Sequence, residues 1–420
     1  MGERPFRVLA IASHPVQYQA PIFRRMAANP QLELHVAYCS MHGAEPSRDP
    51  DFGATVQWDV PLLDGYEWIH VKNHGTGAES FLGLRNSGLW KLIRDGNFDA
   101  VLCFVGYVRA TFWIACWAAK SAGSAFLFGT DATTLAPRDG KSWKIAVKKI
   151  FWPRLFALAD QVIVPSSGTR DLMRTLGIPE DHITLTPYCV DNAWWAERAA
   201  ESDRGATRAA WGIPREDTVI LFCAKLQGWK RPLDLLQAFA RANVSNTWLV
   251  FAGDGAQRSE IESTAADLGI ASRVKILGFV NQSQLPAIYK SADVMVLPSE
   301  YEPFAVVVNE AMCCGCPVIA SDRVGAARDL IAPVEPKFVF PCGNFDALAA
   351  TLVNALSDRA KLAAAARRFV AHMQSWSPEQ NIAATIQAVE RAVSHTKRGS
   401  GALGKSSSAA PRPPVASVKD

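Results

Sequence analysis

The sequence has no long hydrophobic run. No stretch of about 18 or more uninterrupted apolar residues occurs, so no segment is long and apolar enough to be expected to cross a bilayer as a helix. The apolar run near the start is short and has no convincing cleavage site, and it fits a first core strand better than a signal peptide. These absences predict a protein that folds in the cytoplasm.

A disulfide framework and a zinc site are also missing. The nine cysteines are an odd number and are scattered singly, apart from Cys313, Cys314 and Cys316. Such a set indicates a reducing compartment. Cys313 and Cys316 have CxxC spacing, but no second pair or nearby histidine completes a zinc site. We expect these thiols to be buried and inert.

The chain has little excess charge of either sign. Its formal net charge is +4, and the segment from His395 to the end carries all of it, so the rest is close to neutral. A uniformly basic nucleic-acid binder is therefore excluded, and we expect no nucleic-acid partner. No Gly-x-Gly-x-x-Gly follows an expected strand either, which argues against a nicotinamide-dependent enzyme.

Short β-rich runs alternate with helical stretches along most of the chain. Many of the runs are continuously apolar, as in strands buried on both faces of a parallel sheet. This alternation predicts an α/β fold with Rossmann-like, doubly wound sheets. The expected strands are 6–12, 32–38, 99–105, 124–129, 161–165, 182–187, 218–224, 246–253, 273–278, 293–299 and 316–321; the expected helices include 109–122, 166–176, 231–243, 258–269 and 345–374.

The strand series begins twice, which predicts two domains. No β-rich run occurs between Asp191 and Thr218, so we place an interdomain linker there. The predicted domains are residues 1–192 and 193–376. In open α/β sheets ligands bind at the carboxyl ends of strands, so the loops that directly follow strands are the candidate sites.

The chain is expected to end in a helix and a tail. Ser377 can act as N-cap and Pro378 suits the first helical position, which predicts a last helix over 377–394. Residues 395–420 are basic and rich in Ser, Pro, Gly and Lys, with no core-forming content. We expect this tail to be disordered.

Two glutamates follow the expected strand 293–299. Glu302 and Glu310 are eight residues apart, a little over two helical turns. A helix that begins at Pro303 or Phe304 would direct free backbone N–H groups at an anion such as phosphate, and Glu310 could face Glu302 and accept from ribose hydroxyls. Taken alone, a glutamate near a helix start is also ordinary dipole complementation.

Two lysines follow the expected strand 218–224. Lys225 and Lys230 bracket a glycine-containing turn just before Pro232. Two ammonium groups at a strand end can neutralise a diphosphate, above all one that departs with extra charge. Taken alone, such lysines are equally typical of a solvated surface.

These loops occur in a recognisable order with further turns after strands. Gly253-Asp254-Gly255 ends one strand, Gly278-Phe279 the next, and an Ala-Met-x-x-Gly-x-Pro-Val run occupies 311–318. The series resembles the donor domain of GT-B glycosyltransferases, specifically the retaining family 4. The resemblance is strong over 218–345 and weaker in the first domain, where HPVQYQAP and TPYCVDN are similar to bacterial members.

The resemblance implies a role for each donor residue. Glu310 would hold the donor ribose and Glu302 the hydroxyls of the donor sugar. Retention by front-face attack, with the leaving diphosphate helping to deprotonate the acceptor, would need no metal and no cofactor besides the nucleotide-sugar substrate. Lys225 and Lys230 would bind the diphosphate, the amides of Phe304, Ala305 and Val306 would line sugar and phosphate, Gly253 would belong to the same site, and the base would lie near Gly278 and Phe279.

The sequence departs from the family pattern at three places. Lys225 stands where many members have arginine, which keeps the charge but loses the bidentate fork. Ala305 stands where glycine is usual, so the backbone approaches a donor less freely. Many members also have a histidine near the donor sugar, whereas the comparable loop here has Asp131 as the candidate.

Candidate acceptor contacts lie in the first domain. His14 and Gln17 follow the opening strand, and Tyr107 and Arg109 follow strand 99–105. A lone histidine is equally a satisfied structural group, so the role of His14 stays open.

Residues 141–154 are basic and aromatic. This arrangement suits a helix lying on an anionic lipid surface, helped by the basic tail, at the inner face of the cytoplasmic membrane. It equally suits a helix that packs Trp143 and Val147 into the core. On a helix, one side would carry Lys141, Lys144 and Lys148 and the other Trp143, Val147 and Ile150.

Together these observations predict a hexosyl-type GT-B glycosyltransferase. It would move a sugar from a UDP- or GDP-type donor to a glycan or lipid-linked acceptor with retention, in bacterial polysaccharide or glycolipid synthesis. The first domain would hold the acceptor and the second the donor, with the 377–394 helix crossing back to the first. The alternatives are a nucleotide-sugar 2-epimerase of the same fold and a non-catalytic sugar-nucleotide or glycan-binding protein.

Overall fold

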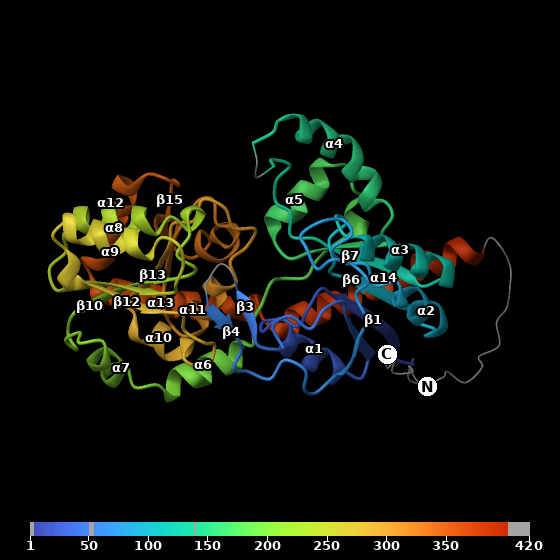
Figure 1. Ribbon diagram of the computed structural model, residues 1–420, viewed down its shortest axis with the longest axis horizontal. Coiled ribbons are helices and arrows are strands. Elements are labelled where there is room, and N and C mark those ends of the chain that lie inside the picture. Colours follow the sequence, from blue (N-terminus) through green and yellow to red (C-terminus); the bar gives the residue numbers. More distant parts are fainter. Residues whose placement is uncertain (1–3, 50–53, 138–139, 402–420) are drawn as a thin grey trace. The chain divides into compact units, whose positions relative to one another are not determined.

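The computed structural model describes residues 4–49, 54–137 and 140–401. By their contacts they form two compact units (Figure 1). The first comprises Met1–Glu45, Pro61–Pro187 and Pro378–Asp420, and the second comprises Pro46–Val60 and Tyr188–Ser377. Each unit has a parallel sheet with helices on both faces, so the predicted α/β fold with two Rossmann-like sheets is confirmed.

The first unit is built on a parallel sheet in the order β5-β2-β1-β6-β7-β8-β9. Its central strands are Val- and Ile-rich and buried, because helices cover both faces. The strands are β1 (Phe6–Ala12), β2 (Leu32–Tyr38), β5 (Glu67–His70), β6 (Ala100–Cys103), β7 (Ala125–Gly129), β8 (Gln161–Val164) and β9 (Ile183–Leu185); the helices before β9 are α1 (Ala20–Ala27), α2 (Gly88–Asp95), α3 (Ala110–Ala122), α4 (Trp143–Phe156) and α5 (Ser167–Thr175).

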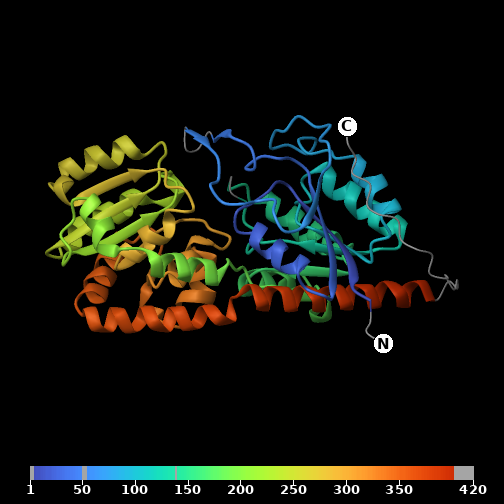
Figure 2. The same ribbon diagram turned by 90° about the horizontal axis from the view of Figure 1, so that it is seen from below.

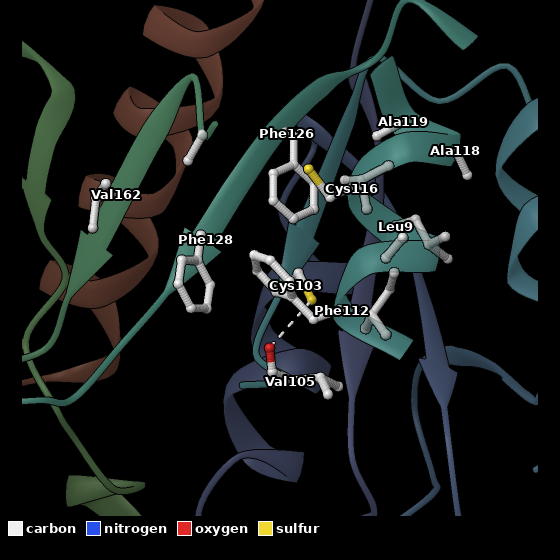
Figure 3. Packing of buried hydrophobic residues seen from close by; sticks show 14 of the residues in the cluster. Leu9, Cys103, Val105, Phe112, Cys116, Ala118, Ala119, Phe126, Phe128 and Val162 are labelled. Carbon is white, nitrogen blue, oxygen red and sulfur yellow. Dashed lines mark hydrogen bonds between the residues drawn. The ribbon is translucent and has the colours of Figure 1, made fainter. Parts of the chain in front are cut away.

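The core of this unit is aromatic where α3 lies on the sheet (Figure 3). Phe112 of α3 packs against Phe126 and Phe128 of β7, with ring centroids 5.6 and 4.6 Å apart. The Cys103 and Cys116 side chains fill the space beside these rings and are fully buried. Burial raises the pKa of both thiols, to about 12 for Cys103 and about 11 for Cys116, so they remain protonated at neutral pH.

The last helix, α14 (Pro378–Gly401), packs on the first unit (Figures 1 and 2). Its buried side contacts β7, β8 and β9, and Asn381 donates to the Pro187 carbonyl over 2.9 Å. It starts at Pro378, as expected, but continues past the predicted end at residue 394 to Gly401. The rest of the predicted tail, residues 402–420, lies outside the described residues.

The second unit has a parallel sheet in the order β12-β11-β10-β13-β14-β15. A short hairpin of β3 (Ser47–Asp49) and β4 (Ala54–Val56) belongs to this unit. The strands are β10 (Thr218–Cys223), β11 (Thr247–Ala252), β12 (Val274–Gly278), β13 (Val294–Leu297), β14 (Val318–Ser321) and β15 (Val339–Phe340); the helices are α6 (Asn192–Glu201), α7 (Arg204–Ala210), α8 (Pro232–Ala242), α9 (Arg258–Asp267), α10 (Leu285–Ser291), α11 (Val307–Cys313), α12 (Phe345–Leu356) and α13 (Arg359–His372).

Two predicted segments differ in the structure. The stretch after Asp191, predicted to be a linker, forms helices α6 and α7, because Asp191 and Asp203 cap the two helix starts. These helices pack on α10 and α11. The chain passes from one unit to the other already at Pro187. The single helix predicted over 345–374 is two helices, since Asp358 accepts from the N–H groups of residues 360 and 361 and starts α13.

No helix within the described residues is long and apolar enough to cross a membrane.

Candidate functional site

The loops at the carboxyl ends of β10 to β14 are hydrogen-bonded to one another. The Leu226 N–H, after β10, donates to the Asp254 carbonyl after β11 over 2.9 Å. Gly253 and Gly278 form a bridge between the loops after β11 and β12. Because the strands are parallel and adjacent, the candidate donor residues of these loops share one sheet edge.

Two glycines allow these loops to approach closely. A Cβ atom at Gly253, where φ is 156°, would lie 2.0 Å from the Ala224 carbonyl oxygen. A Cβ atom at Gly325 would lie equally close to the Pro303 carbonyl oxygen. Any larger residue at either position would push the loops apart.

Lys230 and Glu302 form an ion pair at this edge. The Lys230 ammonium group contacts Oε1 of Glu302, which also accepts from the Ser299 hydroxyl over 3.2 Å. Both charged side chains are mostly buried but keep some exposed area. Lys225, at the start of the same loop, is half-buried. The structure thus brings one predicted lysine against a predicted glutamate.

The expected helix start at Pro303 or Phe304 is wrong. Helix α11 begins at Val307, so Glu302 lies in the preceding loop and Glu310 lies in the first turn. Residues 302–304 pair instead with the loop after β14: the Gly325 N–H donates to the Glu302 carbonyl over 3.0 Å and the Ala326 N–H to the Phe304 carbonyl over 2.9 Å. These bonds hold residues 302–304 out of helical geometry.

Ala305 adopts a left-handed conformation, with φ at 84°. This is the position where the family pattern has glycine, so the backbone geometry is kept although the side chain is less suited to it. Phe304 is buried between Tyr188 and Trp376, with ring centroids 5.0 and 5.6 Å away. Phe304, Ala305 and Val306 can therefore line a site chiefly through backbone groups.

Glu310 carries a buried carboxylate. The Tyr289 hydroxyl of α10 donates to its Oε2 over 2.8 Å, and Cys223 of β10 lies 3.3 Å from the same hydroxyl. Burial raises the pKa of Glu310 to about 7, and the Tyr289 hydrogen bond opposes that rise. Sequence reasoning missed Tyr289 and Cys223, because both lie in apolar stretches that look like ordinary core.

The predicted base-binding turn is partly exposed. Gly278 ends β12, and the Phe279 ring that follows is half-buried and lies 6.2 Å from the ring of Trp58. Trp58 belongs to the segment that precedes β5 in sequence but groups with the second unit.

His14 follows β1 in the first unit. Its Nδ1 lies 2.9 Å from the Ser13 hydroxyl and its ring lies edge-on to His42, 5.5 Å away. Burial, and secondarily the nearby His42, lower the pKa of His14, so its neutral form is favoured. Gln17 lies three residues on and is half-buried.

Tyr107 and Arg109 follow β6 and both support local structure. The Tyr107 hydroxyl accepts from the Trp152 indole N–H over 2.9 Å. One guanidinium nitrogen of Arg109 donates to the Ala78 and Ser80 carbonyls, each over 2.8 Å, and so holds that loop. Asp131, after β7, is exposed.

The exposed side of α4 carries three large apolar side chains. Trp143, Val147 and Ile150 are 62%, 51% and 64% exposed, so the alternative that Trp143 and Val147 pack into the core is wrong. The core contacts come from the end of the helix, where Trp152 and Phe156 are buried. The Lys148 ammonium group donates to the Leu135 carbonyl, in the loop that precedes α4, over 3.0 Å.

Both halves of the chain match known protein families. Residues 203–372 match the model of glycosyl transferases group 1, and residues 19–189 match that of the glycosyl transferase 4-like domain.

The individual proteins that this chain resembles agree with these family matches. An uncharacterized glycosyltransferase of Methanocaldococcus jannaschii is 34% identical over 206 residues, 47% of this chain and 51% of the relative, so the match spans about half of that protein. The D-inositol 3-phosphate glycosyltransferase of Rhodococcus opacus is 26% identical over 316 residues, 71% of this chain and 70% of the relative. The crystal structure of Anabaena HepE in complex with UDP has a TM-score of 0.67 at 17% identity, covering 94% of this chain and 100% of that one.

Proposed function

We propose that the chain is a GT-B glycosyltransferase that transfers a sugar from a UDP- or GDP-type donor to a glycan or lipid-linked acceptor, and the support is the match of its two halves to two glycosyl transferase families. The observation that carries the proposal is the gathering of Lys230, Glu302 and Glu310 around one sheet edge. A cation for a diphosphate, a carboxylate for sugar hydroxyls and a second carboxylate for a ribose are what a nucleotide-sugar requires.

In the donor half of the proposed reaction, the lysines stabilise the charge that develops on the leaving diphosphate. As the bond between the anomeric carbon and the diphosphate breaks, negative charge grows on the diphosphate, and the ammonium groups of Lys225 and Lys230 stabilise it. Glu302 holds the Lys230 ammonium in place before the donor arrives and offers its second oxygen to the sugar. Glu310, held by Tyr289, accepts from the ribose hydroxyls.

We place the acceptor in the first unit, against the loops after β1, β6 and β7 where His14, Gln17, Tyr107, Arg109 and Asp131 lie. In the retaining, metal-independent scheme, the acceptor hydroxyl attacks from the face that the diphosphate leaves. The new C–O bond forms there and the departing diphosphate takes the proton. Synthesis of a polysaccharide or glycolipid is the reaction class that this acceptor assignment fits.

The direct test is a panel of nucleotide-sugars offered without acceptor. We expect one donor to stabilise the protein against thermal unfolding and to be slowly hydrolysed. The variants Lys230→Ala and Glu310→Ala should abolish this hydrolysis. Lys337→Ala is the matched control, since Lys337 is an exposed lysine of the same unit, away from these loops in sequence. Return of an altered sugar without acceptor would identify a 2-epimerase instead, and binding without any turnover would identify a binding protein.

We further propose that the exposed side of α4 contacts an anionic lipid surface, which would bring a lipid-linked acceptor to the enzyme. The support is its row of exposed apolar side chains on a helix that also carries lysines. The test is sedimentation with vesicles of anionic phospholipid at low salt, comparing wild type with Trp143→Ser and Ile150→Ser. Trp117→Ser, at a 50% exposed tryptophan of α3, is the control. Equal binding by all four proteins, or none by any, would contradict the proposal.

A further inference from the structure

A short piece of chain that lies between β2 and β5 in sequence packs on the second unit. Residues 46–60 group with that unit, and the side chains of residues 57–60 are described. The strands on either side in sequence, β2 and β5, pair with each other in the first unit. Residues 46–60 therefore belong to the second unit although the strands before and after them belong to the first.

The described hydrogen bonds of residues 57–59 are made with the loop after β12. The Asn281 side-chain amide donates to the Gln57 carbonyl over 2.8 Å and its oxygen accepts from the Asp59 N–H over 3.4 Å. The Asp59 carboxylate accepts from the Ser283 N–H over 3.0 Å and also from the Ser283 hydroxyl. The Asp59 carboxylate thus holds both the main chain and the side chain of Ser283.

An aromatic contact lies beside these hydrogen bonds. The Trp58 ring lies 6.2 Å from that of Phe279, tilted by 56°, and both side chains are half-buried. Between the two bonded positions lies Gln282, which is 6% exposed and whose Oε1 has no hydrogen-bond partner. The loop therefore places a half-buried aromatic ring three residues from a buried acceptor that has no hydrogen-bond partner among the described residues.

These groups match the needs of a nucleobase. A base offers a flat π face for stacking and N–H groups that require acceptors. This step rests on the proposed function, in which the base of the donor lies near Gly278 and Phe279. Segment 57–59 would then determine how the base-binding loop is shaped.

We propose that residues 57–59 form the outer wall of the donor's nucleobase subsite, with Asp59 as a positioning residue that fixes the loop 279–284 and Trp58 supporting the Phe279 ring. The base contacts the loop 279–284, and Asp59 holds this loop in its conformation. A segment that only fastens the chain to the unit would affect stability but not the discrimination between ligands with and without a base.

The test compares nucleoside diphosphates with inorganic pyrophosphate by calorimetric titration of the full-length protein. We expect Asp59→Ala and Trp58→Ala to weaken the preferred nucleoside diphosphate about tenfold, the value of about one charged hydrogen bond. Pyrophosphate, which has no base, should bind as in wild type. Trp58→Phe should restore most of the affinity that Trp58→Ala loses.

Asp64→Ala is the matched control, because Asp64 is an exposed aspartate five residues on that makes no contact with the loop after β12 among the described hydrogen bonds. It should leave both ligands unchanged. Equal weakening of nucleoside diphosphate and pyrophosphate by Asp59→Ala, or no weakening of either, would overturn the proposal. Failure of wild type to bind any nucleoside diphosphate would instead overturn the proposed function.

Discussion

At the scale of single residues, Glu310 is a buried carboxylate at the proposed donor site. The residue is 7% exposed and burial raises its pKa to about 7, so the protonated and charged forms are both populated near neutral pH. A ribose hydroxyl is held best by the charged form. Binding of the donor should therefore depend on pH in the physiological range.

The first prediction concerns stability. The pKa of Glu310 is about 7 in the fold and about 4.5 when exposed, so the stability that its protonated form contributes is lost as pH rises between these values. Relative to Glu310→Gln, wild type should lose roughly 2–3 kcal/mol of unfolding free energy from pH 4.5 to 8. Urea unfolding at both pH values measures it, and parallel pH profiles of the two proteins would contradict it.

The second prediction concerns binding. Affinity for a nucleoside diphosphate should rise through pH 7 in wild type and lack this component in Glu310→Gln, because only the wild type gains a carboxylate. The comparison cancels titration of the ligand's own phosphate, whose second pKa is about 6. Tyr289→Phe should move the wild-type rise to higher pH, since the Tyr289 hydrogen bond lowers the pKa of Glu310.

The third prediction concerns backbone strain at Ala305. Glycine tolerates a φ of 84°, whereas alanine does so at a cost of about 1 kcal/mol, so Ala305→Gly should stabilise the protein by about that amount. Ala266→Gly is the control. Ala266 is exposed within α9, and there the same replacement should destabilise by about 1 kcal/mol. The same sign for both variants in thermal unfolding would refute the strain.

At the scale of elements, a buried arginine joins α7 to the sheet of the second unit. Arg208 is 1% exposed, donates to the Ser291 and Asp217 carbonyls and pairs with Asp293 over 2.6 Å. Asp293 in turn accepts from the Val219 N–H of β10 over 2.7 Å. The pair thus links α7 to β10 and to the start of β13.

The fourth prediction is that Arg208→Met destabilises the second unit by about 3 kcal/mol, because Asp293 keeps its burial and loses a buried partner. Arg204→Met removes the other arginine on Asp293, whose side chain is 40% exposed, and should cost well under half as much. Urea unfolding monitored in the second unit measures both. Equal losses would show that burial of the pair does not matter.

The sequence sufficed for elements that are long or continuously apolar. All eleven expected strands exist, because Val- and Ile-rich runs buried on both faces leave no other interpretation. β5 was missed because its residues are largely exposed, and β15 because it has only two residues. The start of α11 was placed too early, since a pairing with the loop after β14, distant in sequence, decides it. Tyr289 could not be assigned from an apolar stretch.

At the scale of the whole molecule, the first unit is built from stretches that are far apart in the sequence. The first unit includes α14, which is separated from Pro187 in sequence by residues 188–377 of the second unit. Helix α14 contacts β7 and β8, and its buried residues include Ile386 and the fully buried Val389. Stability of the first unit therefore depends on the far end of the chain.

The fifth prediction follows. Val389→Asp should undock α14 and speed amide hydrogen exchange in β7 and β8, because a buried unpaired carboxylate costs several kcal/mol. Strands β10 and β11 should exchange as in wild type. Gln387→Asp, at an exposed position of the same helix, is the control and should leave both units unchanged. Faster exchange in both units would show that their stabilities are not separate.

The docking of α14 has a consequence for the protein during its synthesis. The first unit is translated as far as Pro187, and then roughly 190 residues follow before Pro378 leaves the ribosome. At about 5–20 residues per second, β7 and β8 wait about 10–40 s without the helix that covers them. The second unit has no such delay. The domain made first is thus the one completed last, and a nascent-chain chaperone would be expected to act on it during that interval.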